Sequence, residues 1–99
     1  MLGVKWLRGT AAAKTDAAAA LTVAQVHALH GDFVWATLQR MGIRDRDLED
    51  VFQEVFVVVH QRLHTFEGRS RMTTWLFGVC LKVAAAHRRR AYVRNEAPT

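Results

Sequence analysis

The sequence predicts an all-α protein, a compact bundle of three long helices with room for a short fourth helix near the N-terminus. Three segments repeat apolar residues at intervals of three and four, the spacing of one helix face. Short connections join these segments, and the one proline, Pro98, follows the last of them. Hydrophobic residues make up 51% of the 99 residues, which suits one domain with a core of its own.

The first helix is predicted from Val23 to Met41. Thr22 and Gln25 have the spacing of a capping box, in which each side chain accepts a hydrogen bond from the other residue's backbone N–H. Gly42 is expected to end the helix, because glycine takes the left-handed conformation without a steric cost. The face expected to point into the core consists of Val26, Leu29, Phe33, Val34, Thr37, Leu38 and Met41.

The second helix is predicted from Arg46 to His64, with Asp45 as its N-cap. Acidic residues in its first turn suit the positive end of the helix dipole. The run of residues 55–59 is apolar enough for a strand, but the helical pattern extends well beyond it on both sides. The expected core face consists of Leu48, Val51, Phe52, Val55, Val58, Val59 and Leu63.

The third helix is predicted from Met72 to Val93. It follows a loop over residues 65–71, in which Gly68 is the flexible point and Ser70 the expected helix cap. The expected core face of this helix consists of Trp75, Leu76, Val79, Val83 and Ala86.

The ends of the chain and its cysteine content indicate the broad class of protein. Residues 1–20 are rich in alanine without a clean period, so we expect a flexible arm before a helical domain at 21–95 and a tail at 96–99. Charges interrupt the N-terminal segment, which argues against a secretory signal, and no apolar run approaches the roughly 18–20 residues that span a membrane. The single Cys80 fits a reducing compartment. We therefore expect a cytoplasmic protein without membrane insertion.

One side of the second helix is acidic. The stripe, which follows intervals of three and four with an amide beside it, consists of Asp47, Asp50, Gln53 and Glu54. A solvated helix face explains this pattern about as well as a docking surface for a basic partner. Phe56 and Val57 lie near the stripe and are too apolar for an idle surface, which favours docking.

The segment from Phe66 to Arg94 is strongly basic. It has seven lysines and arginines against one acid, Glu67, and so carries +6, whereas the whole chain carries +5. Cations favour a helix C-terminus, but the three arginines at 88–90 point about 100° apart and spread their charge around the helix. Basic side chains interleaved with aromatic rings suit single-stranded nucleic acid. Trp75 fits either a core position or a stacking platform.

The sequence gives little support to metal binding or catalysis. His60 and His64 have the i, i+4 spacing of helical metal ligands, but no third ligand is evident and the HExxH pattern is missing. No grouping of a nucleophile, a base and an orienting acid stands out. We therefore expect neither a metal, nor a cofactor, nor an enzymatic activity.

Four short motifs together resemble a known family. They are LEDVFQEVF at 48–56, FEG at 66–68, TWLF at 74–77 and HRRR at 87–90. In this order and spacing they resemble region 2 of sigma-70 family RNA polymerase sigma factors, of the extracytoplasmic-function (ECF) type. The resemblance covers about two thirds of the chain.

The resemblance implies a helical bundle that binds RNA polymerase core and promoter DNA during transcription initiation. It implies docking on the clamp helices of the β′ subunit through Asp47, Asp50, Gln53, Glu54 and Val57. It also implies that the loop and the third helix hold the single-stranded −10 region, on the non-template strand, through Phe66, Glu67, Gly68, Arg69, Ser70, Arg71, Thr73, Lys82, Arg88, Arg89 and Arg90. Within this set the resemblance assigns the loop at 67–73 to a base pocket, and the residues from Lys82 onward to the path of the strand. An anti-sigma factor is a further partner that the family allows.

Two positions depart from the family pattern. Lys82 stands where members often have Asn, and Ala86 stands where they often have Asp. A lysine suits a phosphate contact better than base readout, and an alanine removes a polar contact. Nothing in the sequence resembles region 4, the second helical domain of ECF factors. The alternative is therefore a protein-interaction module, bound by an anti-sigma factor or degenerate, without DNA binding.

Overall fold

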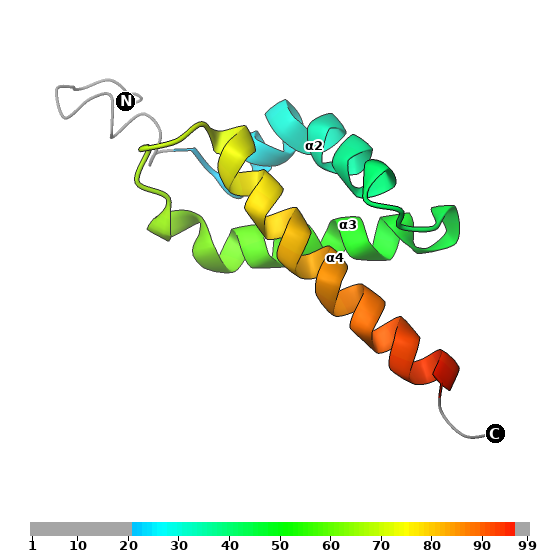
Figure 1. Ribbon diagram of the computed structural model, residues 1–99. Helices are drawn as coiled ribbons and strands as arrows, with labels where there is room; N and C mark the ends of the chain where they lie inside the picture. The colour runs from blue at the N-terminus through cyan, green and yellow to red at the C-terminus, as the bar shows by residue number, and fades with distance from the viewer. Residues whose placement is uncertain (1–20, 97–99) are drawn as a thin grey trace, which may run out of the picture.

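The computed structural model describes residues 21–96, which are helical for most of their length and contain no strand (Figure 1). The elements are the helices α2 (Val23–Arg40), α3 (Asp45–Arg62) and α4 (Met72–Glu96), with the 3-10 helix η1 (Leu63–Thr65) after α3. The all-α bundle of three long helices is therefore confirmed. The predicted arm at 1–20 and residues 97–99 lie outside the described part of the chain.

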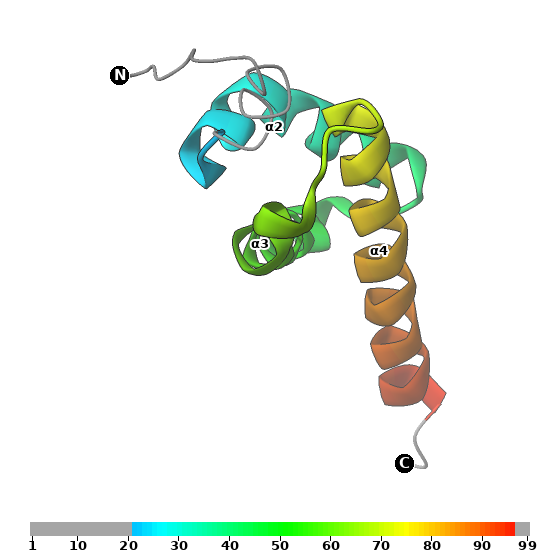
Figure 2. The ribbon, with the colours of Figure 1, turned by 90° about the vertical axis from the view of Figure 1, so that its left-hand side faces the viewer.

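The three helices pack pairwise around one core, and each contacts both of the others. Figure 1 shows α4 crossing over α3, and Figure 2 shows its C-terminal half continuing beyond the other two helices. With 25 residues, α4 is about 37 Å long. One continuous helix therefore contributes to the core with its first half, contacts α2 and α3 through side chains at 87–90, and extends beyond them with its last turns.

Both ends of α2 form as the sequence predicts. The backbone N–H of Gln25 donates to Thr22 Oγ1 at 3.1 Å, and that of Thr22 donates to Gln25 Oε1 at 2.8 Å. At the other end Gly42 has a φ of 88°. The N–H of Gly42 donates to the Gln39 carbonyl at 3.0 Å, and that of Ile43 donates to the Leu38 carbonyl at 3.2 Å. This pair of bonds is a Schellman motif, which fixes the turn into α3.

The predicted caps of the other two helices are wrong. Arg44 is the N-cap of α3 and makes no side-chain cap bond, so Asp45 is already helical and contributes negative charge to the first turn instead. At the start of α4, the N–H of Trp75 donates to the Arg71 carbonyl at 3.2 Å, which makes Arg71 the N-cap, one residue after the predicted cap Ser70. The Ser70 hydroxyl donates to the same carbonyl at 3.4 Å.

The core lies where the three apolar faces meet. Its fully buried apolar side chains come from all three helices: Val26, Val34, Leu38, Leu48, Val51, Val55, Val59, Leu76, Cys80 and Ala84. Within residues 21–94, Thr37 is the one buried polar side chain, and its hydroxyl donates to the Phe33 carbonyl at 2.7 Å. The run at 55–59 is helical, as its length predicted.

For two residues the predicted burial is wrong. Leu29, predicted for the core, is 66% exposed, because the buried arc of α2 is centred on the side of Val26 and Val34. Phe56, predicted for the surface near the acidic stripe, is 9% exposed. Its ring lies 4.8 Å from that of His27, centroid to centroid, because α2 covers this side of α3.

Candidate functional site

A groove runs along the line where α3 meets α4. It encloses about 710 Å³. Its lining residues are Glu54, Val57, Val58, Gln61, Arg62, Thr65, Trp75, Gly78, Val79, Lys82, Val83, Ala86 and Arg90. The groove thus joins residues of the predicted polymerase-binding set to residues of the predicted DNA-binding set.

Apolar and basic side chains line the groove together. Val58, Val79 and Val83 are buried or half-buried, whereas the cationic side chains of Arg62, Lys82 and Arg90 are exposed. Glu54 is the one acid among its lining residues. A surface of this kind accepts a ligand that is apolar or aromatic in its body and anionic at its edge.

Trp75 lies between the core and the groove. It is half-buried and packs against the core cluster, and it also lines the groove. Its ring lies 5.7 Å from that of Phe66, with the planes tilted by 57°. The indole therefore packs against Phe66, a core residue, and also lines the groove.

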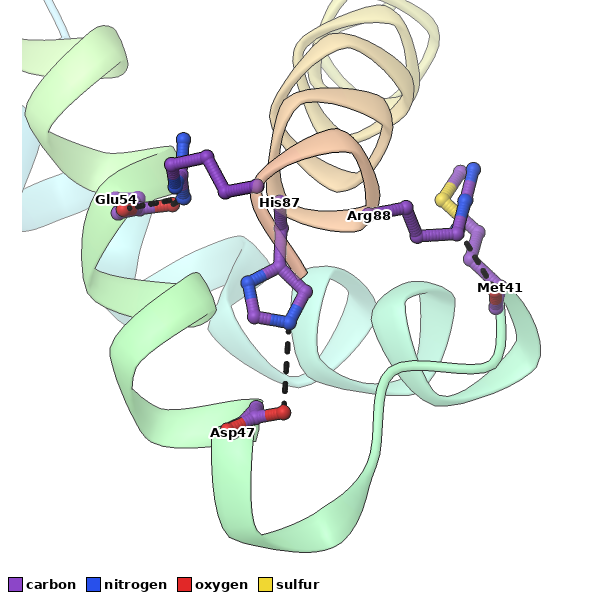
Figure 3. Close-up of polar contacts among 6 residues, drawn as sticks. Met41, Asp47, Glu54, His87 and Arg88 are labelled. Carbon is purple, nitrogen blue, oxygen red and sulfur yellow. Dashed lines mark hydrogen bonds and ion pairs between the residues drawn. The ribbon is translucent and has the colours of Figure 1, made fainter. Parts of the chain in front are cut away.

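The acidic stripe of α3 divides into two parts. Glu54 accepts two hydrogen bonds from Arg90 Nη2, at 3.0 and 2.9 Å. Asp47 Oδ2 lies 3.4 Å from His87 Nε2. Figure 3 shows these two acids on α3 facing residues of α4. Asp47 and Glu54 therefore lie at the edge of the stripe next to α4.

The rest of the stripe faces solvent. Asp50 and Gln53 are exposed, and no ion pair or side-chain hydrogen bond engages either one within the described residues. Val57 is 55% exposed beside them. These three residues form an accessible surface with an acid, an amide and an apolar group.

The loop between η1 and α4 brings most of the predicted base-binding residues together. Phe66 differs from the other residues of this set because its ring is buried in the core, where it anchors the loop. Gly68 has a φ of 78°, which a residue with a side chain rarely adopts. Glu67 and Arg69 form an exposed ion pair at 3.1 Å. The exposed or half-buried remainder of the set consists of Ser70, Arg71 and Thr73.

The three successive arginines of α4 do not form one row. Arg90 lies at the groove, whereas Arg88 Nη1 donates to the Met41 carbonyl at 3.1 Å on the side of α2. In Figure 3, Arg88 points away from Glu54 and towards Met41. Arg89 lies between these two directions and is exposed. Of the predicted strand-binding residues on α4, the groove includes Lys82 and Arg90.

The residues weighed for other chemistry lie apart from the groove. His60 and His64 are both exposed, and no group of three or more potential metal ligands is found among residues 21–96. Burial raises the pKa of the Cys80 thiol to about 11, which keeps the thiol neutral. No helix within residues 21–96 is both long and apolar enough to cross a membrane.

Comparison with known proteins decides the family. Residues 27–93 match the sequence profile of Sigma-70 region 2. The chain belongs to the sigma-70 region 2 family. A 43-residue stretch is 44% identical to the ECF RNA polymerase sigma factor SigX of Bacillus subtilis (strain 168), covering 42% of this chain and 22% of that relative. No solved structure matches significantly. The sigma-70 region 2 resemblance, of the ECF type, is thereby confirmed.

Sequence reasoning missed part of the region 2 groove. Gln61, Arg62 and Gly78 line it and were not expected to contribute. Arg62 follows Val58 by four residues, so its place on the same side of α3 could have been inferred. The groove itself could not, because it depends on how α4 crosses α3.

Proposed function

We propose that this chain is the promoter-recognition domain of an ECF-type sigma factor, which binds the β′ clamp helices of RNA polymerase and the non-template strand of the −10 element. The observation that carries the proposal is the basic, aromatic-lined groove between α3 and α4, which adjoins the exposed acidic surface of α3. The SigX relative is named as an RNA polymerase sigma factor, which supports the same role. The chain spans about a fifth of that relative's length, so the activity of the whole protein belongs to the proposal.

The polymerase contact is assigned to the exposed part of the acidic stripe. Asp50, Gln53 and Val57 offer a carboxylate, an amide and an apolar group on one side of α3. A basic partner surface with an apolar centre would complement them, and the attraction between opposite charges would guide the encounter. Asp47 and Glu54 would reach a polymerase only by giving up their partners on α4.

The DNA contact is assigned to the loop and the groove together. Arg69 and Arg71 flank the exposed loop, where an unstacked base can be held, and Lys82 and Arg90 continue the positive charge along the groove. Trp75 supplies an aromatic surface between the two. Proteins usually bind single-stranded nucleic acid in this way, with cations at the phosphates and with the bases against an aromatic and apolar wall. The domain acts by binding, without covalent chemistry, in the cytoplasm.

Titration of a fluorescent single-stranded −10 oligonucleotide at several salt concentrations tests the DNA half. We expect binding that weakens steeply with salt, and Lys82→Gln should reduce the salt slope by about 0.7 because one phosphate contact is lost. Arg46→Gln is the matched control, since it removes the same charge from an exposed position outside the site. A lack of binding at low salt, or an affinity that does not change with salt concentration, refutes the proposed DNA contact.

Capture of a β′ clamp-helix fragment tests the polymerase half. Replacing Asp50 and Gln53 together with Ala should abolish capture, whereas Asp32→Ala, at an exposed position on α2, should leave it intact. Undiminished capture by the double variant would show that another surface binds. Capture without any DNA binding would favour the alternative, a protein-interaction module to which an anti-sigma factor is the natural partner.

A further inference from the structure

We propose that Glu54 pairs with Arg90 in the DNA-free domain, and that this pairing keeps Arg90 from contacting a DNA phosphate. The inference rests on the proposed function, because it requires that DNA enter the groove. It assigns Glu54 a role within the DNA interface, as an internal competitor, rather than as part of the acidic surface alone.

In this pair the Glu54 carboxylate contacts the Arg90 guanidinium in the way that a phosphate group would. Both carboxylate oxygens of Glu54 accept from the same nitrogen, Arg90 Nη2, at 3.0 and 2.9 Å. A carboxylate and a phosphate present the same kind of anionic oxygen pair to a guanidinium, so they compete for its donors. Both side chains line the groove, which puts the competition where the DNA is proposed to lie (Figure 3).

The pair is also weak enough to exchange. The side chains of Arg90 and Glu54 are 52% and 45% exposed, and an exposed ion pair contributes little to stability because water and salt screen it. A DNA strand brings several phosphates at once, and its binding releases counterions. Displacement of Glu54 by phosphate therefore costs little, but the cost is subtracted from the affinity for DNA.

The other two side-chain contacts of α4 with distant residues, among those described, have a different character. The Asp47–His87 pair is more buried, at 30% and 15% exposure, and neither residue lines the groove. Arg88 binds a neutral backbone carbonyl, that of Met41. Glu54–Arg90 is the contact in this set that combines opposite charge, exposure and a place in the groove.

The test is oligonucleotide affinity measured on the full chain with Glu54→Gln. The probe is a short fluorescein-labelled single-stranded DNA of mixed sequence at low salt. We expect Glu54→Gln to bind it about three- to fivefold more tightly than the wild type, since an exposed ion pair can withhold about that much. Glu49→Gln is the matched control, because it removes one exposed acid from the same helix away from α4, and it should change affinity by less than twofold.

A second pair of variants separates local competition from a general gain in positive charge. In an Arg90→Gln background, which has lost the contested contact, Glu54→Gln should give no further gain beyond that of Glu49→Gln. A gain that persists in that background, or one matched by Glu49→Gln in the wild type, overturns the inference while leaving DNA binding established. If no variant binds the oligonucleotide at low salt, the DNA half of the proposed function fails, and the inference fails with it.

Discussion

The indole of Trp75 lies against the phenyl ring of Phe66, with ring centroids 5.7 Å apart. Phe66 is the first residue after η1 and is buried, while Trp75 is in the first turn of α4 and lines the groove. The contact thus joins the beginning of the loop at 66–71 to the helix that follows the loop. Tilted ring pairs of this kind contribute beyond the area they bury. The position of the proposed base-binding loop therefore depends on a core residue.

Replacing Phe66 with Ala should destabilise the domain by about 3 kcal/mol, the usual loss for a buried Phe. Urea unfolding followed by circular dichroism measures the change. The neighbouring Glu67→Ala, at an exposed position, should change the free energy of unfolding by less than about 0.5 kcal/mol. Equal effects of the two substitutions would mean that the ring is not an anchor.

The Asp47–His87 contact should contribute to holding α4 against α3. Because both side chains are largely shielded, a double-mutant cycle with Asp47→Asn and His87→Ala should give a coupling energy of about 0.5–1 kcal/mol at one fixed pH. The same cycle on Asp50 and His87, which are not paired, supplies the baseline. Strictly additive losses in the first cycle would show that the contact contributes nothing.

The glycines Gly42 and Gly78 should respond to alanine in opposite directions. A Cβ would meet no atom within 4 Å at either position, so neither substitution clashes. Gly42 has a φ of 88°, and alanine there should cost about 1 kcal/mol of backbone strain. Gly78 lies within α4, and alanine there should stabilise by up to about 1 kcal/mol. Thermal unfolding of both variants checks the signs, and a stabilised Gly42→Ala would contradict the left-handed turn.

The thiol of Cys80 should be inert while the domain is folded. Burial raises its pKa from 9.0 to about 11, so the folded state favours the neutral thiol and the unfolded chain ionises first. This contribution to stability is complete below about pH 9 and is lost as the pH rises towards 11.

Cys80→Ala should therefore flatten the fall in unfolding free energy over that pH range. In parallel, an alkylating reagent at pH 9 should modify the urea-unfolded chain much faster than the folded one, because the thiolate is the reactive form. Equal rates of alkylation would show that Cys80 is accessible and ordinary.

Local signals were sufficient for most of the fold. The capping box at Thr22 and the turn at Gly42 formed as predicted, since both depend on residues close together in the sequence. The cap at Asp45 was misplaced by one residue, because Arg44 can fill that position without a side-chain bond. Leu29 and Phe56 were misjudged for a tertiary reason, namely the sides on which α2 and α3 are covered.

The candidate site was predicted as a set of residues but not as an arrangement. The acidic stripe and the basic helix were both evident from spacing. That Glu54 would bond to Arg90, 36 residues away, could not be inferred, because it depends on the angle at which α4 crosses α3. The division of the stripe follows from that same crossing, whereas the divergence of the arginines was expected from the 100° between successive helical residues.

The unbroken course of α4 has a consequence for how this domain can vary. Each added or deleted residue turns everything after it by about 100° and shifts it by about 1.5 Å. A single insertion between Val79 and Lys82 would thus carry Lys82 and Arg90 off the groove, and would take His87 away from Asp47 at the same time. Variants of this domain should accept substitutions at the exposed positions of α4, but no insertion or deletion between Val79 and Arg90.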